Sequence, residues 1–338
     1  MSAGLTTPGQ VDNGERGGTE PQRSRVAGLL RSWRMAGIFI PFLLLFIVLS
    51  IASSPFLHTS NLINIADQQA STLIIAAAGT LVLVSGGIDL SVGATYGLTG
   101  VVAAQIAEHH SSVEAIIVGL ALGILIGLVN GVIVAVFKIN ALITTLAMSF
   151  VITGVASRLT SGNLIVLPST SSFGSFAQSM LLGLPSAVWM AIVVVVLLAL
   201  VLSRTVTGRY LIASGGNAEA ARLAGVQVNW VRILAFVLSG GAAALGGIID
   251  GSRFLSVEAT SGGATLAFTV LAAIVVGGTS IAGGEGSVVR TTIGVLFIAL
   301  IGNGFDLLGL NPLYQQVALG IILLVAVGVD VWARHRRR

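Results

Sequence analysis

The chain of 338 residues is 55% hydrophobic and only 9% charged. This composition excludes a water-soluble globular protein and is typical of a polytopic membrane protein, so we predict an all-α fold. The absence of cysteine excludes a disulfide framework, a thiol nucleophile and a thiolate metal site.

Residues 1–34, before the first apolar run, are polar and unpatterned and include several arginines. We predict that they form a disordered cytoplasmic tail. The alternative is a secretory signal cleaved near the small residues at 52–54. The run that begins at Met35 is long for a signal sequence, and cleavage would leave the later topology unchanged.

About ten apolar runs follow, judged against the roughly 20 residues that a helix needs to cross a bilayer. They predict a transmembrane domain over residues 35–333, followed by a basic tail at 334–338. The eighth run is short enough to be a half-helix. The runs are 35–54, 70–86, 90–107, 114–137, 141–157, 186–203, 231–250, 264–277, 288–306 and 313–333.

The basic residues indicate the orientation of these runs. With a cytoplasmic N-terminus, Lys138, the arginines of loop 204–232, Arg290 and the C-terminal tail all lie inside, and only Arg158 and Arg253 lie outside. Positive residues in short loops set orientation, so both termini are predicted to be cytoplasmic. The net charge of +4 is then a topological signal, and nucleic acid is not an expected partner.

Two glycine-rich segments, residues 85–93 and 277–287, interrupt the apolar runs. Backbone that leaves a helix at membrane depth must face protein or a water-filled cavity, because lipid cannot satisfy its N–H and C=O groups. Such breaks predict a transport path, although any single glycine can instead serve close helix packing or a tight hairpin. Both breaks fall on the same side by helix count, so no inverted repeat is established.

Few ionisable residues lie away from the ends of the runs. The exceptions are Asp89 and Glu285 in the breaks, Asp250 at the end of the seventh run and Asp306 after the ninth. For Asp89, we favour capping of the following helix over transport chemistry. Ion-coupled carriers bury such groups within their helices, so their scarcity argues against that class.

The chain has no motif for catalysis or nucleotide binding. Its only lysine, Lys138, is followed by Ile139, which excludes a G-x-x-x-x-G-K-[ST] phosphate loop. His109 and His110 lie beside Glu108 in an outer loop, where a solvated loop is a better interpretation than a metal site. We therefore predict no catalytic residue, metal or cofactor on this chain.

The largest polar loop on the cytoplasmic side contains a predicted short helix. Asn217 is a suitable N-cap, Glu219 falls in the first turn and Gly225 is placed to end the helix. Glu219 and Arg222 are three residues apart and can lie close together, which leaves Leu223 and the alanines to face a partner. The alternative is a solvated connector that only sets orientation.

Several long motifs occur in order along the chain. They are Gly86-Gly-Ile-Asp-Leu-Ser-Val-Gly93, Asn130-Gly131, Leu142-Ile-Thr-Thr-Leu146, Gly208-Arg-Tyr210, Gly215-Gly-Asn-Ala-Glu-Ala-Ala-Arg-Leu-Ala-Gly225, Gly277-Gly-Thr-Ser280 and Gly283-Gly-Glu-Gly-Ser-Val288. Together they resemble the membrane permeases of ribose-type ATP-binding cassette (ABC) sugar importers, in the branched-chain amino acid/ribose permease superfamily. The resemblance runs from about residue 40 to the end.

The resemblance implies a permease that pairs with a second permease copy, cytoplasmic ABC ATPases and an extracytoplasmic sugar-binding protein in the bacterial cytoplasmic membrane. ATP and Mg²⁺ would bind to the ATPase, and a monosaccharide or small polyol would cross unchanged. One alternative is an ion-coupled secondary transporter of a small neutral metabolite. A membrane-embedded enzyme is disfavoured by the missing catalytic groups.

The resemblance also implies two groups of site residues, one for coupling to the ATPase and one for the translocation path or its hinge. For the threonines of the path, hydrogen bonding to nearby backbone is the favoured alternative. The expected coupling residues are Asn217, Ala218, Glu219, Ala220, Ala221, Arg222, Leu223 and Gly225. The expected path or hinge residues are Gly86, Gly87, Asp89, Ser91, Gly93, Asn130, Thr144, Thr145, Gly277, Gly278, Thr279, Ser280, Gly283 and Gly284.

This chain departs from the family pattern at three places. It has Ile139-Asn140-Ala141 where the family often has a proline, Phe268-Thr269 where a Leu-Asp pair is usual, and Arg290 where glycine is usual. The transport class survives these changes, while the substrate assignment is weakened.

Overall fold

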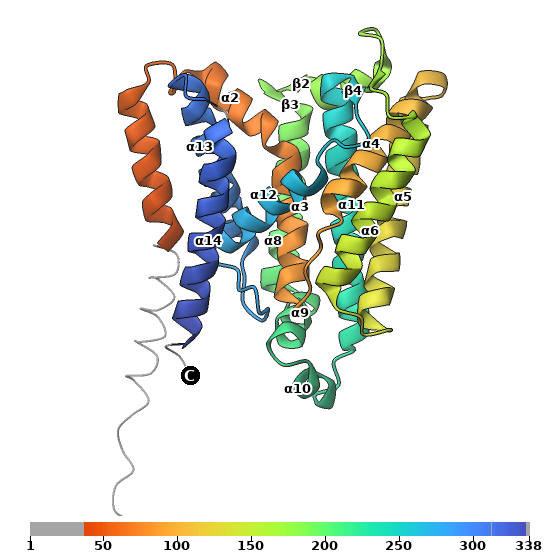
Figure 1. The fold of residues 1–338 in the computed structure, drawn as a ribbon, viewed down its shortest axis with the longest axis vertical. Coiled ribbons are helices and arrows are strands. Elements are labelled where there is room, and N and C mark those ends of the chain that lie inside the picture. Colours follow the sequence, from red (N-terminus) through yellow and green to blue (C-terminus); the bar gives the residue numbers. More distant parts are fainter. Residues whose placement is uncertain (1–36, 312, 336–338) are drawn as a thin grey trace, which may run out of the picture.

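The computed structural model describes residues 37–311 and 313–335. The predicted tail at residues 1–34 lies outside this range, as does most of the tail at 334–338. Figure 1 shows helices running between two ends of the molecule. The end at the bottom of the view, which carries α10, is called the α10 end. The end at the top, which carries the short strands, is called the hairpin end.

Every apolar run predicted from the sequence is a helix. These helices are Gly37–Ala52, α3 (Ala70–Val84), α4 (Val92–His109), α5 (Ser112–Ala135), α6 (Ala141–Thr160), α8 (Ser186–Arg204), α11 (Val228–Phe254), α12 (Gly263–Val276), α13 (Val288–Leu307) and α14 (Leu313–His335). The predicted all-α polytopic fold is therefore confirmed.

Five helices of the described residues, α5, α6, α8, α11 and α13, are long and apolar enough to cross a membrane. A sixth candidate is the pair formed by α2 (Thr59–Gln68) and α3, which is bent by 46°. Helix α12 has 14 residues, or roughly 21 Å, and is too short to cross a hydrocarbon core of about 30 Å. The predicted short segment is thus present as α12, and the glycine-rich segments fall between α3 and α4 and between α12 and α13, while the bend between α2 and α3 was not predicted. Helix α2 was not predicted because polar residues interrupt its apolar ones.

Helix α3 lies at the centre of the fold and is buried along most of its length. It packs against α8, α11, α12 and α13. Glycines bring α5 and α11 together, since a Cβ at Gly127 would lie 2.3 Å from Phe236 O and one at Gly240 would lie 2.2 Å from Gly123 O. At these positions the close-packing interpretation of glycine applies.

The hairpin end carries a short excursion between α6 and α8 that the sequence did not predict. It contains η1 (Ser172–Gly174) and α7 (Ser175–Gln178). Strand β1 (Ile165–Val166) pairs antiparallel with β4 (Ser256–Val257), and β2 (Met180–Leu181) pairs with β3 (Leu184–Pro185). Two-residue strands carry no periodic pattern, which explains why they were missed.

The α10 end consists of α9 (Val206–Gly216) and α10 (Ala218–Leu223). The predicted short helix is confirmed as α10, because Ala220 N donates to Asn217 Oδ1 at 3.0 Å and Gly225 follows the helix with a φ of +85°. Helix α9 was not predicted, because its apolar residues are few and it was included in the polar loop.

Candidate coupling and translocation site

The two glycine-rich breaks are in direct backbone contact. Gly284 N donates to Val84 O at 2.9 Å. A Cβ at Gly283 would lie only 2.9 Å from Gly86 Cα, so no side chain separates the two segments. Because both breaks meet at one level of the fold, the expectation that they lie on the same side is confirmed.

The end of α9 is the third member of this contact. A Cβ at Gly215 would lie 1.9 Å from Val84 O and 2.7 Å from Gly284 N. One at Gly284 would lie 2.7 Å from Gly216 Cα. We call residues 84–87, 215–216 and 283–284 the glycine junction. Since α10 begins two residues after α9 ends, the junction connects both breaks to the short helix.

Arg232 of α11 holds two of these segments from one side. Its Nε donates to Ser85 O at 3.2 Å, and its Nη2 donates to Ser214 O at 3.4 Å. The guanidinium thereby binds carbonyls that the last turns of α3 and α9 leave free, where a positive charge also suits the helix dipoles. From the sequence, Arg232 was interpreted only as a signal of membrane orientation. Its position one turn inside the seventh helix could have indicated that its guanidinium binds within the fold.

Asp89 is partly buried and accepts three hydrogen bonds. Its Oδ1 accepts from Ser91 N at 3.0 Å and from Ser91 Oγ at 2.6 Å, and its Oδ2 accepts from Ser239 Oγ at 2.8 Å. Asn130 Nδ2 donates to Ser91 Oγ at 2.9 Å. This network ties the segment before α4 to α5 and α11. The N-cap of α4 is Ser91, without a side-chain cap hydrogen bond, so Asp89 braces the residue that begins the helix and does not cap the helix itself.

Of the predicted threonines, Thr145 hydrogen-bonds to nearby backbone. Leu90 N donates to Thr145 Oγ1 at 3.0 Å, and Thr145 Oγ1 donates to Ala141 O at 2.9 Å. The hydroxyls of Thr144 and Thr279 are buried and have no hydrogen-bond partner within the described residues. Ser280 is also buried.

The remaining predicted glycines differ in what surrounds them. A Cβ at Gly93 would lie 1.8 Å from Gly263 O, so α4 and α12 touch there. One at Gly87 would lie 3.2 Å from the Phe236 ring, and one at Gly277 would lie 2.7 Å from Arg290 O. Gly278 has open space and a φ of +78°.

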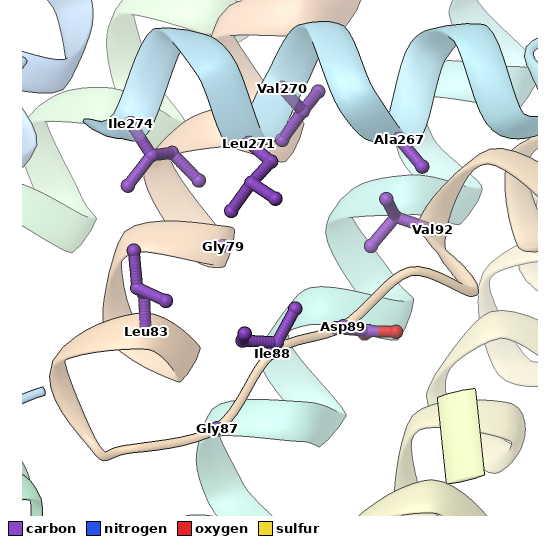
Figure 2. Close-up of a pocket in the computed structure, with 10 residues that line it drawn as sticks. All are labelled: Gly79, Leu83, Gly87, Ile88, Asp89, Val92, Ala267, Val270, Leu271 and Ile274. Carbon is purple, nitrogen blue, oxygen red and sulfur yellow. The ribbon is translucent and has the colours of Figure 1, made fainter. Parts of the chain in front are cut away.

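Beside the first break lies a cavity of about 20 Å³, which is room for about one water molecule. Figure 2 shows apolar side chains of α12, including Val270 and Ile274, facing Leu83 and Ile88 across it. A solute larger than water does not fit in this cavity.

A second cavity, of about 560 Å³, lies toward the hairpin end between α2, α12, α13 and α14. Of the residues singled out from the sequence, it contains Asp306 and Thr269. Its other polar residues were missed, because each reads as the polar end of a helix. They are Asn61, Asn64, Gln68, Gln69, Thr72, Thr265, Asn303, Gln315 and Gln316.

Asp250 belongs to a polar cluster at the hairpin end. Its Oδ1 lies 2.9 Å from Arg253 Nη2, and its Oδ2 accepts from the Tyr96 hydroxyl at 2.7 Å. Arg253 also lies 3.8 Å from a carboxylate oxygen of Asp67, in α2. These contacts join α2, α4 and α11, which is a structural use of the acidic group.

The outward surface of the α10 end is partly apolar. Leu223 is 84% exposed, and Trp230 at the start of α11 is 62% exposed. Arg222 Nη1 lies 3.5 Å from Glu219 Oε2, as the spacing predicted. Two alanines depart from the expected outward face: Ala221 is only 5% exposed and packs into the protein, and Ala218 is partly buried against the same cluster.

A multi-helix membrane fold whose end helices contact breaks in its core is the arrangement expected of a transport permease. The chain belongs to the family described as branched-chain amino acid transport system / permease component, whose profile matches residues 61–327. The resemblance predicted from the motifs is therefore confirmed, and the chain is a multi-pass permease subunit rather than an enzyme. Family membership implies a separate ATPase and a binding protein as partners.

Curated relatives cover nearly the whole chain. The ribose import permease protein RbsC of Escherichia coli (strain K12) is 40% identical over 295 residues, which are 86% of this chain and 92% of that protein. RbsC of Bacillus subtilis (strain 168) is 38% identical over 314 residues, 92% and 96% of the two chains. The L-arabinose transport system permease protein AraH of E. coli (strain K12) is 36% identical over 313 residues, 91% and 94% of the two chains. No solved structure matches.

Proposed function

We propose that this chain carries a monosaccharide or a related small polyol across the bacterial cytoplasmic membrane, as the permease of an ABC importer. It pairs with a second permease copy, both with cytoplasmic termini. An extracytoplasmic sugar-binding protein delivers the solute. The chain itself binds no cofactor, and ATP and Mg²⁺ bind to the cytoplasmic ATPase. Relatives named for ribose and for L-arabinose support a sugar as the solute.

The observation that carries this proposal is the path of contacts from α10 to the two breaks. Helix α10 follows α9 directly, and Gly215 of α9 touches both Val84 and Gly284 through backbone atoms. A contact between backbones cannot yield by a change of side-chain rotamer. When the ATPases close on ATP and displace α10, the breaks must move as well, which converts ATP binding into a change of access.

The surface of α10 suits a groove on a protein partner. Burial of an exposed side chain such as Leu223 stabilises an interface by about 1.5–3 kcal/mol. The exposed pair Glu219–Arg222 contributes little to the fold, since such pairs are worth about 0–1 kcal/mol. Its charges are therefore available to orient α10 in the groove.

Co-purification from native membranes in mild detergent tests the proposal, with ATP hydrolysis and sugar uptake measured on wild type and on Arg222→Glu. We expect an ATPase subunit to accompany the wild type and to be lost or uncoupled in Arg222→Glu. The control is Arg158→Glu, the same charge reversal on an exposed residue at the opposite end, which should behave as wild type. Solute movement by the chain alone, driven by an ion gradient, would refute the proposal.

A further inference from the structure

We propose that the 560 Å³ cavity near the hairpin end is a binding site where the permease holds an uncharged polyhydroxylated solute during transport. The inference rests on the proposed function and specifies where that solute stops. The volume falls within the roughly 300–1,000 Å³ typical of small-molecule sites. The cavity beside the first break, of about 20 Å³, is too small for this purpose.

The chemistry of the wall matches hydroxyl groups. The chain has ten asparagines and nine glutamines, and seven of those nineteen carboxamides line this one cavity. A carboxamide both donates and accepts hydrogen bonds, as a sugar hydroxyl does. Three threonine hydroxyls complete the wall, and among the described residues that line it there is no Lys, Arg or His. The cavity therefore favours a neutral polyol over an anion such as a phosphorylated sugar.

Most of these groups are available to a solute. Asn61 and Asn303 are partly occupied, because they donate to each other at 3.2 and 2.8 Å and so join α2 to α13. Within the described part of the chain, the side chains of Gln68, Gln315 and Thr269 have no hydrogen-bond partner. Asp306 is the only ionisable group among the lining residues that the structure describes, and its carboxylate can accept hydrogen bonds from two adjacent hydroxyls of a sugar.

The cavity is mechanically connected to the glycine junction. Helix α3 lines it near its N-terminus through Thr72 and ends at the first break. Helix α12 lines it through Thr265 and Thr269 and ends at the second break. These two helices, each roughly 20 Å long, join the cavity wall to the segments that α9 contacts. A movement of the junction therefore reshapes the cavity, which is what release of a held solute requires.

Uptake kinetics of the complete importer test the site, with D-ribose and L-arabinose as probes. Gln315→Leu and Thr269→Val each remove hydrogen-bonding groups from the wall at similar volume, and each should raise the KM for uptake about fivefold per hydrogen bond lost. Thr292→Val is the control, because Thr292 donates to Val288 O on α13 outside the cavity. Wild-type KM values in both wall variants would overturn the inference.

A second measurement stays informative if a wall variant assembles poorly. Because the chain has no cysteine, Thr269→Cys introduces a single thiol that a membrane-impermeant maleimide can label in the assembled importer. We expect rising D-ribose to protect this thiol while L-leucine does not, and an exposed His109→Cys to be labelled equally in either solute. A thiol that ribose leaves unprotected, or one that is unreactive because a second copy fills the cavity, would overturn the inference. These outcomes concern the cavity alone. The proposed function would instead be refuted if the wild type takes up no sugar or binds no ATPase.

Discussion

Replacement of Gly215 by alanine tests the glycine junction most directly. The added Cβ would lie 1.9 Å from Val84 O, whereas ordinary contact begins at 3.4 Å, so the two atoms must separate by about 1.5 Å. The two atoms nearest to the added Cβ, Val84 O and Gly284 N, both belong to the backbone, so neither can move away by rotation of a side chain. The displacement also stretches the 2.9 Å hydrogen bond from Gly284 N to Val84 O.

The steric overlap and the stretched hydrogen bond both add to the free-energy cost of Gly215→Ala. Overpacking a tight contact costs about 1–3 kcal/mol, and loss of the hydrogen bond adds about 1 kcal/mol. Alanine offsets up to about 1 kcal/mol through its higher helix propensity. We therefore expect Gly215→Ala to destabilise the closed junction by a net 1–3 kcal/mol or so, and to abolish or strongly reduce coupled uptake.

Gly216→Ala is a closely matched control. It lies in the same helix and gains a similar propensity, but its Cβ would meet only Gly284 Cα, at 3.9 Å. Sugar uptake, ATP hydrolysis and the thermal unfolding midpoint should be measured for both variants in the assembled importer. Equal uptake, ATP hydrolysis and unfolding midpoints for Gly215→Ala and Gly216→Ala would refute the reasoning. The junction would then accommodate a Cβ at residue 215 despite its expected overlap with Val84 O.

Three further predictions concern single contacts. Arg232→Lys should lower uptake severalfold in an intact complex, because an ammonium cannot bridge the two carbonyls that the guanidinium binds; unchanged uptake would count against a bridging role. Gly225→Val places a β-branched residue at a φ of +85°, a strain of about 1–2 kcal/mol, and should reduce uptake more than basal ATP hydrolysis. Asp250→Asn should destabilise the fold by about 1–3 kcal/mol in thermal unfolding, because Arg253 loses its closest carboxylate but keeps Asp67; an unchanged midpoint would contradict this.

The sequence predicted the features whose causes are local. Each apolar run forms a helix, and such runs can be recognised directly in the sequence because their residues are consecutive. The cap at Asn217 and the end at Gly225 were also predicted, since both depend on residues within a few positions.

The contacts between distant segments were not predictable in the same way. Gly215 meets Val84 and Gly284 across large sequence separations, and a glycine carries no side chain to specify its partner. The polar cavity was missed for a related reason, because residues such as Gln68 and Gln315 lie near the ends of separate helices. Only their convergence in space distinguishes them from ordinary polar helix ends.

The division of labour between α9 and α10 has a practical consequence for building hybrid transporters. The outward residues of α10, with Leu223 almost fully exposed, touch little else in the chain and can be exchanged for those of another importer to recruit a foreign ATPase. Helix α9 cannot be exchanged so freely, because its Gly215 must fit against two other backbones. A functional graft should therefore begin at residue 217, and one that begins upstream must keep Gly215.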